Sequence, residues 1–231
     1  MRITYHWIKK LASEHGVRRI PISTRSLTGE VLGTEFESAL ERDLMLLMSF
    51  DRTVDSFQSQ PVRIHYEYPG GGKRHYTPDL LIAFTPSNDF VTPQPMLCEV
   101  KYREDLSQNW RELRHKFRAA RAHCKEFGWR FEVFDEHRIR THRLANIQFL
   151  WKYRTATYGR EFAPIIFEHL KAARRPLRMV ETVNVLFSSD EDRGAAIWAW
   201  WCLVAKKLIE CDLEAPFGRD TTFGLPDWRY L

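Results

Sequence analysis

Two short apolar segments of strand type are each interrupted by charged side chains. The segment "YTPDLLIAF" carries Asp79, and the segment "MLCEVKYRE" carries Glu99 and Lys101. Because residues two apart in a strand face the same side, Glu99 and Lys101 project together and Val100 points the other way. If the two strands pair, Asp79 lies beside Glu99. Two carboxylates and a backbone carbonyl suit Mg²⁺, and a neighbouring lysine can position a water or stabilise developing negative charge. The pattern predicts metal-dependent phosphodiester hydrolysis.

A simpler interpretation is an ion pair between Glu99 and Lys101 on a solvent-facing strand, worth less than about 1 kcal/mol. The segment "MLCEVKY" argues against it, because it lies between two other apolar strands and central strands of such sheets have both faces covered. A buried charged pair costs several kcal/mol unless something compensates it. A bound metal ion would provide that compensation.

The elements that must position these residues follow from hydrophobic spacing and turn residues. Residues 34–50 predict a helix with Thr34 and Glu37 at capping-box spacing, and residues 109–128 predict a second helix that ends at Gly128. The remaining predicted elements are strands within 53–68, a turn at 69–73 that makes a hairpin, and strands at 75–84, 96–102 and 129–136. This order predicts an α/β fold with a mixed sheet flanked by helices.

The composition changes after residue 137. No carboxylate occurs between residues 137 and 160, and helical patterns follow. We therefore predict a small helical C-terminal domain, of winged-helix type if the basic stretch 169–178 is a recognition element rather than a solubilising surface. The predicted organisation is a basic N-terminal arm (1–33), the α/β domain (34–140), the helical domain (141–215) and an extended tail (216–231).

Aromatic residues in the C-terminal part allow two interpretations. The run "IWAWWC" at 197–202 is typical of a packed core rather than of a surface that stacks on bases. The tail contains Phe217, Phe223, Trp228 and Tyr230, which either dock on a partner subunit or pack on their own domain.

Composition narrows the class of protein. The chain has 231 residues, 44% of them hydrophobic, with a net charge of +5 and a pI near 9.1. A mildly basic balance permits an anionic partner without requiring one. The four cysteines form no C-x-x-C pair, which disfavours a structural zinc site and a disulfide framework. Without an apolar leader or a membrane-length apolar run, the sequence predicts a soluble cytoplasmic protein with no membrane association.

The spacing P-D followed by E-V-K resembles the PD-(D/E)xK signature of nucleases with the restriction-endonuclease-like fold. A longer ordered set is more specific: "ESALERDLMLLMSFD", "FQSQPVRI", "YTPDLLI" and "CEVK" occur in that order. This set resembles TnsA, the endonuclease subunit of heteromeric cut-and-paste transposases, over roughly residues 30–154.

The resemblance implies a set of site residues. In that family a glutamate on the first helix joins the Asp, the ExK acid and the Lys. Glu37 and Glu41 are both candidates here, and Glu41 is preferred because it stands before Phe50 as the family's glutamate stands before its aromatic residue. Gln60 matches a Gln-Pro step that supports the site, although a plain turn residue explains it equally well. The implied metal ligands are Glu41, Asp79, Glu99 and the Val100 carbonyl, and Lys101 completes the catalytic set with the three acids.

The resemblance also implies the reaction and its partners. TnsA-like subunits use Mg²⁺, for which Mn²⁺ can substitute, and cut the non-transferred strand near the 5′ ends of the transposon. Their partners are transposon-end duplex DNA, the DDE transposase TnsB and the AAA+ regulator TnsC, in the bacterial cytoplasm, and in many such systems a CRISPR effector selects the target. Two alternatives stay open: a non-catalytic module that bridges the transposase and its regulator, and a stand-alone restriction or repair nuclease.

The predicted helix at 109–128 is strongly basic. Arg111, Arg114, Arg118 and Arg121 are candidates for contacts with DNA phosphates, because neutralising the phosphate backbone drives non-specific DNA affinity. A solvated helix face is an equally simple interpretation of each of these residues.

Overall fold

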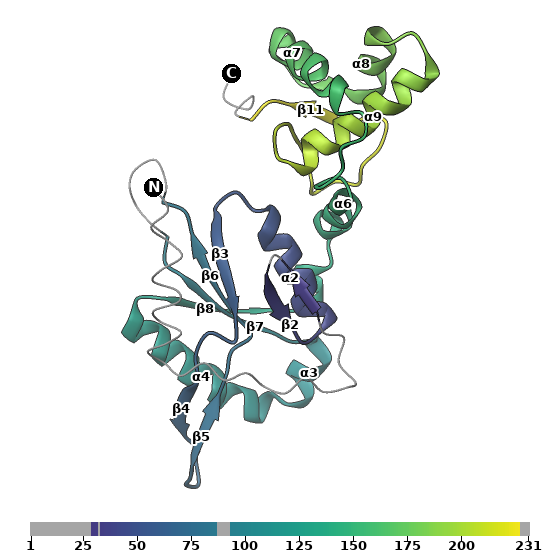
Figure 1. Ribbon diagram of the computed structural model, residues 1–231. Helices are drawn as coiled ribbons and strands as arrows, with labels where there is room; N and C mark the ends of the chain where they lie inside the picture. The colour runs from purple at the N-terminus through teal and green to yellow at the C-terminus, as the bar shows by residue number, and fades with distance from the viewer. Residues whose placement is uncertain (1–28, 32, 87–92, 227–231) are drawn as a thin grey trace. The chain divides into compact units, whose positions relative to one another are not determined.

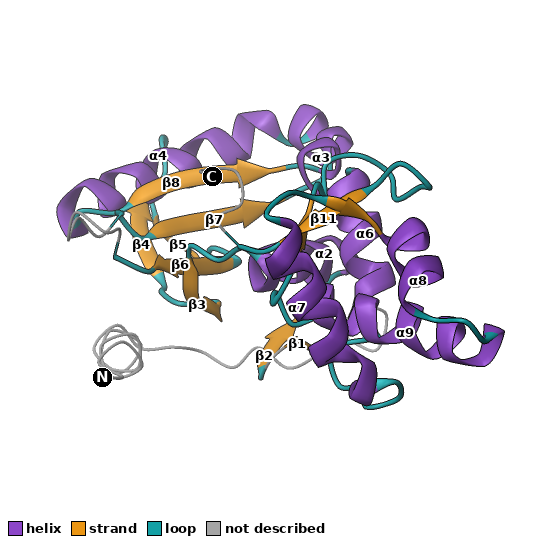
Figure 2. Ribbon diagram, turned by 90° about the horizontal axis from the view of Figure 1, so that it is seen from above, coloured by secondary structure: helices purple, strands orange, loops and turns teal. Residues whose placement is uncertain are grey.

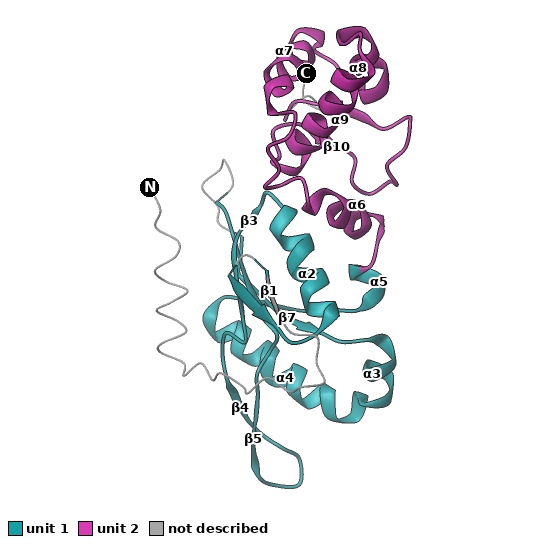
Figure 3. Cartoon of the chain, turned by 45° about the vertical axis from the view of Figure 1, so that its right-hand side comes forward, with its two compact units in different colours: residues 1–139 teal, residues 140–231 magenta. Residues whose placement is uncertain are grey.

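The computed structural model describes residues 29–31, 33–86 and 93–226. The chain divides into two compact units, unit 1 with residues 1–139 and unit 2 with residues 140–231 (Figure 3). The boundary lies one residue before the predicted one. Most of the predicted arm, the centre of the proline-containing loop before residue 96, and Trp228 and Tyr230 of the tail lie outside the described residues.

Unit 1 is built on a four-stranded mixed sheet with the order β3-β6-β7-β8 (Figure 1). Strand β6 pairs antiparallel with both β3 and β7, and β7 pairs parallel with β8. The mixed sheet with flanking helices agrees with the predicted fold class. The strands are β3 (Val54–Ser59), β6 (Leu80–Phe84), β7 (Met96–Val100) and β8 (Arg130–Phe134).

Helix α4 (Trp110–Phe127) runs along the sheet, as Figure 2 shows. Its Ala120 and Cys124 belong to the same buried cluster as Leu81 of β6 and Leu97 of β7. The helix ends where predicted, because Gly128 adopts the left-handed conformation that a C-terminal cap requires. The buried face of α4 thereby fixes the two central strands from one side.

The first predicted helix begins later than its hydrophobic spacing indicates. Residues 34–36 form a short strand, β2 (Thr34–Phe36), which pairs with β1 (Gly29–Val31). Helix α2 (Ala39–Phe50) starts after Ser38, whose side chain accepts a hydrogen bond from the Glu41 backbone N–H. The prediction of Thr34 as the cap was therefore wrong: a second capping sequence, four residues on, was the stronger one. The end of the predicted arm also differs, because β1 belongs to unit 1 and Val31 is buried.

A β-hairpin lies between β3 and β6 in the chain. Strands β4 (Ile64–Glu67) and β5 (Lys73–Tyr76) pair antiparallel around a turn that contains Gly70, Gly71 and Gly72, all with positive φ. Glycine adopts these angles without steric cost, which confirms the predicted hairpin. Two short helices were not predicted: α3 (Arg103–Gln108) and α5 (Glu136–Ile139).

Unit 2 combines helices with a small antiparallel sheet of order β10-β11-β9. The helical prediction is met, but the sheet and the helix at 179–186 were not foreseen. The elements are α6 (His142–Trp151), η1 (Arg160–Phe162), α7 (Ala163–Ala173), β9 (Leu177–Arg178), α8 (Met179–Leu186), α9 (Asp190–Ala205), β10 (Glu210–Cys211) and β11 (Thr222–Gly224).

The described part of the tail packs on its own unit rather than extending from it. Phe223, in the middle strand of the small sheet, is 1% exposed and its ring lies 5.6 Å from that of Trp200. Phe217 lies 5.0 Å from the ring of Trp201. Of the two alternatives for the tail, these contacts correspond to packing on its own domain, and the prediction that "IWAWWC" forms core is confirmed.

Within the described residues, the helices are all too short or too polar to cross a bilayer.

We expect Phe223→Ala to lower the free energy of unfolding of the full chain by about 3–5 kcal/mol, because it leaves a cavity against Trp200 and Trp201. Urea unfolding followed by tryptophan fluorescence measures this loss. Val185→Ala is the control: Val185 is 77% exposed, and its change should stay within about 0.5 kcal/mol. Equal effects of the two substitutions would contradict the assignment of Phe223 to the core.

Candidate active site

Strand pairing brings the first two acids together. Leu80 of β6 is the partner of Cys98 of β7, and the Asp79 backbone N–H donates a hydrogen bond to the Cys98 carbonyl at 3.1 Å. One step further along the antiparallel pair, Asp79 stands opposite Glu99, and opposite residues share a face of the sheet. The predicted pairing of these strands is confirmed.

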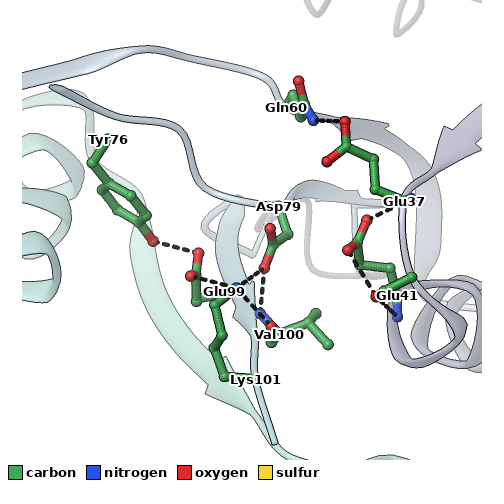
Figure 4. Close-up of polar contacts among 9 residues, drawn as sticks. Glu37, Glu41, Gln60, Tyr76, Asp79, Glu99, Val100 and Lys101 are labelled. Atoms are coloured by element: carbon green, nitrogen blue, oxygen red, sulfur yellow. Dashed lines mark hydrogen bonds and ion pairs between the residues drawn. The ribbon is translucent and has the colours of Figure 1, made fainter. Parts of the chain in front are cut away.

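Lys101 supplies the positive charge of the cluster. Its Nζ lies 3.0 Å from Glu99 Oε1 and 3.6 Å from Asp79 Oδ2 (Figure 4). The Glu99 side chain is only 3% exposed, so it could not be ionised without a nearby cation. Lys101 is held at the end of β7, where its backbone N–H donates to the Phe134 carbonyl of β8 at 3.0 Å.

The backbone of Val100 is part of the same cluster. Its N–H donates to Asp79 Oδ2 at 2.6 Å, and its carbonyl accepts from Lys101 Nζ at 3.1 Å (Figure 4). The predicted ligand carbonyl is thus next to the acids, and in this structure the lysine ammonium occupies it. Asp79 Oδ2 is thus oriented by a backbone donor as well as by the Lys101 side chain.

Tyr76 is a site residue that the sequence analysis missed. Its hydroxyl donates to Glu99 Oε2 at 2.7 Å, and the side chain is buried at the end of β5. Tyr76 opens the "YTPD" stretch, so its proximity to Asp79 in sequence was visible. Its direction was not, because the turn through Thr77 and Pro78 separates it from the strand periodicity of β6.

The capping glutamate at the start of α2 differs from the expected one. Glu41, not Glu37, completes the capping box: its Oε1 accepts from Ser38 Oγ at 2.8 Å and its Oε2 accepts from the Glu37 N–H at 3.1 Å. Glu37 instead accepts from Gln60 Nε2 at 2.7 Å. Serine at the cap with glutamate three residues on is the favoured pairing, and it displaces the Thr34–Glu37 alternative.

Gln60 connects three parts of the site. Its backbone N–H donates to the Asp79 carbonyl at 2.9 Å, while its side chain reaches Glu37. Its φ of 45° is uncommon for a residue other than glycine. A strained conformation held by two contacts indicates that the surrounding structure specifies this turn, which goes beyond a plain turn residue.

Electrostatics joins Glu41 and Glu99 to Asp79. Burial, followed by the charge of Asp79, raises the pKa of Glu41 from 4.5 to about 7. Burial and then Asp79 also raise the pKa of Glu99 from 4.5 to about 7, against the opposing effects of Lys101 and Tyr76. The pKa values of both carboxyls are thus raised first by burial and then by the charge of a third carboxyl close to both.

Lys101 remains a cation. Burial lowers its pKa, but the charges of Asp79 and Glu99 outweigh that effect, so the net pKa lies well above the usual value. A lysine that stays protonated stabilises negative charge; it does not act as a free-amine base.

The site contains oxygen atoms of the kind that bind Mg²⁺, but they are not arranged as a complete coordination shell. Among residues 29–31, 33–86 and 93–226, no group of three or more His, Cys, Asp or Glu side chains is spaced to hold a metal ion. The oxygens of Asp79 and Glu99 and the Val100 carbonyl are nevertheless the hard ligands that Mg²⁺ prefers. Burial and then the charge of Asp79 raise the pKa of Glu41 and of Glu99, and a bound cation would offset both effects, so the residues fit such an ion.

The predicted DNA-binding arginines lie on one helix, away from these contacts. Arg111, Arg114, Arg118 and Arg121 are all exposed on α4, on turns whose other face is buried. In the described part of the chain none of the four forms an ion pair with an acid. The structure therefore presents them to solvent, and their contact with DNA stays a prediction.

An Asp directly before one central strand and a Glu-x-Lys at the end of the next, in a mixed sheet flanked by helices, agree with the predicted restriction-endonuclease-like fold class. Residues 51–136 match the family model described as TnsA-like endonuclease N terminal. The match is narrower than the resemblance at 30–154: it includes Gln60, Tyr76 and the Asp79–Glu99–Lys101 cluster, and leaves out α2 and unit 2. A search of curated proteins gave no match.

The raised carboxyl pKa values predict how stability depends on pH. Between about pH 5 and about pH 7.5 the folded protein holds more protons than the unfolded chain, so its free energy of unfolding should fall as the pH rises. Thermal unfolding in EDTA across this range measures the slope, and Glu99→Gln should reduce it.

Glu126→Gln, on the exposed face of α4, is the matched control and should leave the slope unchanged. If wild type and Glu99→Gln show the same slope, the burial and charge assigned to Glu99 are incorrect.

Proposed function

We propose that this chain is a Mg²⁺-dependent DNA endonuclease that cuts the non-transferred strand near the 5′ ends of a transposon in cut-and-paste transposition. One observation carries the proposal: Asp79, Glu99 and Lys101 converge on paired central strands within the segment that matches the TnsA-like endonuclease model. The family match supports an endonuclease subunit of a transposase. The choice of the cut strand and the requirement for a metal are proposed in addition to that match.

Each residue has a role in that reaction. Asp79, Glu99 and the Val100 carbonyl would hold the metal. Glu41 would be a further ligand, because its pKa responds to the charge of Asp79. When bound, the ion would supply Lewis-acid polarisation of the phosphate and lower the pKa of a water nucleophile. Lys101, protonated at neutral pH, stabilises the charge that develops on the phosphate oxygens and helps to orient the water. Tyr76 holds Glu99 in place through its hydrogen bond to Oε2.

Unit 1 would bind DNA through contacts between basic side chains and phosphates rather than by reading the base sequence. The exposed arginines of α4 follow the Glu-x-Lys strand in the chain, and phosphate contacts position a duplex without specifying bases. A net charge of only +5 favours delivery of the DNA by a partner. We propose that this partner is a DDE transposase of TnsB type, and that an AAA+ regulator of TnsC type joins the complex in a bacterial cytoplasm. The proposal extends to a CRISPR effector as the target selector.

The deciding experiment is strand-specific cleavage of labelled transposon-end DNA, with and without the partner transposase, in Mg²⁺ and in EDTA. We expect a Mg²⁺-dependent cut on the 5′ side, and a loss of at least about 100-fold for Lys101→Ala because one charge-stabilising group is removed. Lys171→Ala, a largely exposed lysine of unit 2, is the control and should cleave as wild type.

Other outcomes would replace the proposal. Excision with an intact 5′-strand cut by Lys101→Ala would rule it out, and unchanged integration products with normal partner binding would favour a bridging module. Robust cleavage of plain duplex by the isolated chain would favour a stand-alone nuclease.

A separate experiment distinguishes Glu41 from Glu37 as the further metal ligand. Glutamine at position 41 can still complete the capping box with Ser38, so we expect Glu41→Gln to retain stability to within about 1 kcal/mol. The same substitution removes a charge beside Asp79 and should lower the cleavage rate by about tenfold or more. Glu37→Gln is the matched comparison and should cleave within about threefold of wild type. The reverse result would assign the role to Glu37.

A further inference from the structure

A groove of about 530 Å³ lies beside the cluster, in unit 1. It is lined by Arg103, Leu106, Ser107, Trp110 and Asp135. These residues come from α3, the start of α4 and the residue after β8, so the groove begins where the parallel strands β7 and β8 end. Ligands of sheets with parallel strands bind outside these carboxyl ends.

Chain connectivity places the groove next to the proposed site. The Lys101 N–H and the Phe134 carbonyl are joined by a hydrogen bond at the ends of β7 and β8. Asp135 directly follows Phe134, and Arg103 stands two residues after Lys101, with its Nε 3.8 Å from Asp135 Oδ2. The Arg103 N–H donates to Glu136 Oε2 at 2.9 Å, which fixes the start of α3 against the end of β8.

Trp110 gives the groove an aromatic surface. Its side chain is 51% exposed, which is unusual for so large an apolar residue. The ring is held by an edge contact with Phe117 of the buried helix face, with centroids 6.2 Å apart and an interplanar angle of 63°. An indole that is supported on one side and open on the other can stack with a planar ring without first being ordered.

The polar groups of the groove fit a nucleobase better than a bare phosphate. Asp135 contributes a carboxylate, which repels an anion. Its Oδ1 accepts from the Arg138 N–H at 2.9 Å and its Oδ2 lies 3.8 Å from Arg103 Nε, and the remaining lone pairs of these oxygens can accept hydrogen bonds from the amino and imino groups of bases. Ser107 can donate or accept, and Leu106 adds an apolar wall. Arg103, whose side chain is largely exposed, supplies one cation at the rim for the phosphate that accompanies a base.

We propose that this groove receives an unpaired nucleobase of the DNA at the cut site, stacked on Trp110 and with its phosphate near Arg103. The inference rests on the proposed function and deepens it. The nuclease would engage a nucleotide that is out of the duplex stack beside the scissile phosphate, which positions that phosphate at Lys101. Stacking is tolerant of sequence, so the groove selects an unpaired base and not a particular one.

The test uses the full chain and a duplex with one unpaired 2-aminopurine, in Ca²⁺ in place of Mg²⁺, against the same duplex fully paired. For wild type we expect 2-aminopurine fluorescence to be quenched on binding and the unpaired duplex to bind more tightly. Trp110→Ala should abolish the quenching and weaken binding of the unpaired duplex about tenfold, with little change for the paired one. Trp110→Phe should retain most of both effects, and Tyr158→Ala, an exposed aromatic of unit 2, is the control.

Several results would overturn the inference. These are no quenching by wild type, equal quenching by wild type and Trp110→Ala, or an equal loss of affinity for both duplexes in Trp110→Ala. The outcome is separable from that of the proposed function. Trp110-dependent quenching by a protein that never cleaves would refute only the endonuclease proposal, and cleavage that is sensitive to Lys101→Ala without such quenching would refute only the base-binding groove.

Discussion

The burial of Glu99 is the constraint on which the rest of unit 1 depends. A buried carboxylate near the end of a central strand is tolerated only if its charge is compensated and its oxygens are hydrogen-bonded. Lys101 meets the first condition at 3.0 Å, and the Tyr76 hydroxyl meets the second at 2.7 Å. Replacing Glu99, Lys101 and Tyr76 together by apolar residues would remove this cost, so their presence here indicates a use other than stability.

The surrounding fold fixes the position of each group that faces this carboxylate. Antiparallel pairing of β6 with β7 sets Asp79 opposite Glu99, and the Val100 N–H then orients the Asp79 side chain. Gln60 holds the Asp79 carbonyl from the end of β3 and extends to Glu37 at the start of α2. The acids therefore depend on backbone contacts of neighbouring strands, which are more rigid supports than side chains on loops.

The sequence predicted the parts of this arrangement that follow from local periodicity. A period of two placed Glu99 and Lys101 on one face, and Gly128 marked the end of α4, because both signals are encoded within a few residues. Tyr76 and the contacts of Gln60 were not predicted, since they depend on how separate strands meet. The start of α2 was misplaced because two capping sequences follow one another directly, and the packing of the tail stayed open because Phe223 is buried only through pairing with strands distant in the chain.

Glu41 shows how stability and function can compete for one side chain. Its carboxylate accepts two hydrogen bonds that begin α2, yet burial and Asp79 raise its pKa to about 7. A group that served only as a cap would gain by lying further from another acid, because the first turn of a helix favours a charged carboxylate. Its retention near Asp79 weakens the cap. That cost is consistent with a carboxylate held ready for a cation, and the capping contacts restrict its position before the cation binds. In the proposed site, the Glu41 carboxylate caps α2 and also binds the cation, so the start of the helix holds the ligand in position before the cation binds.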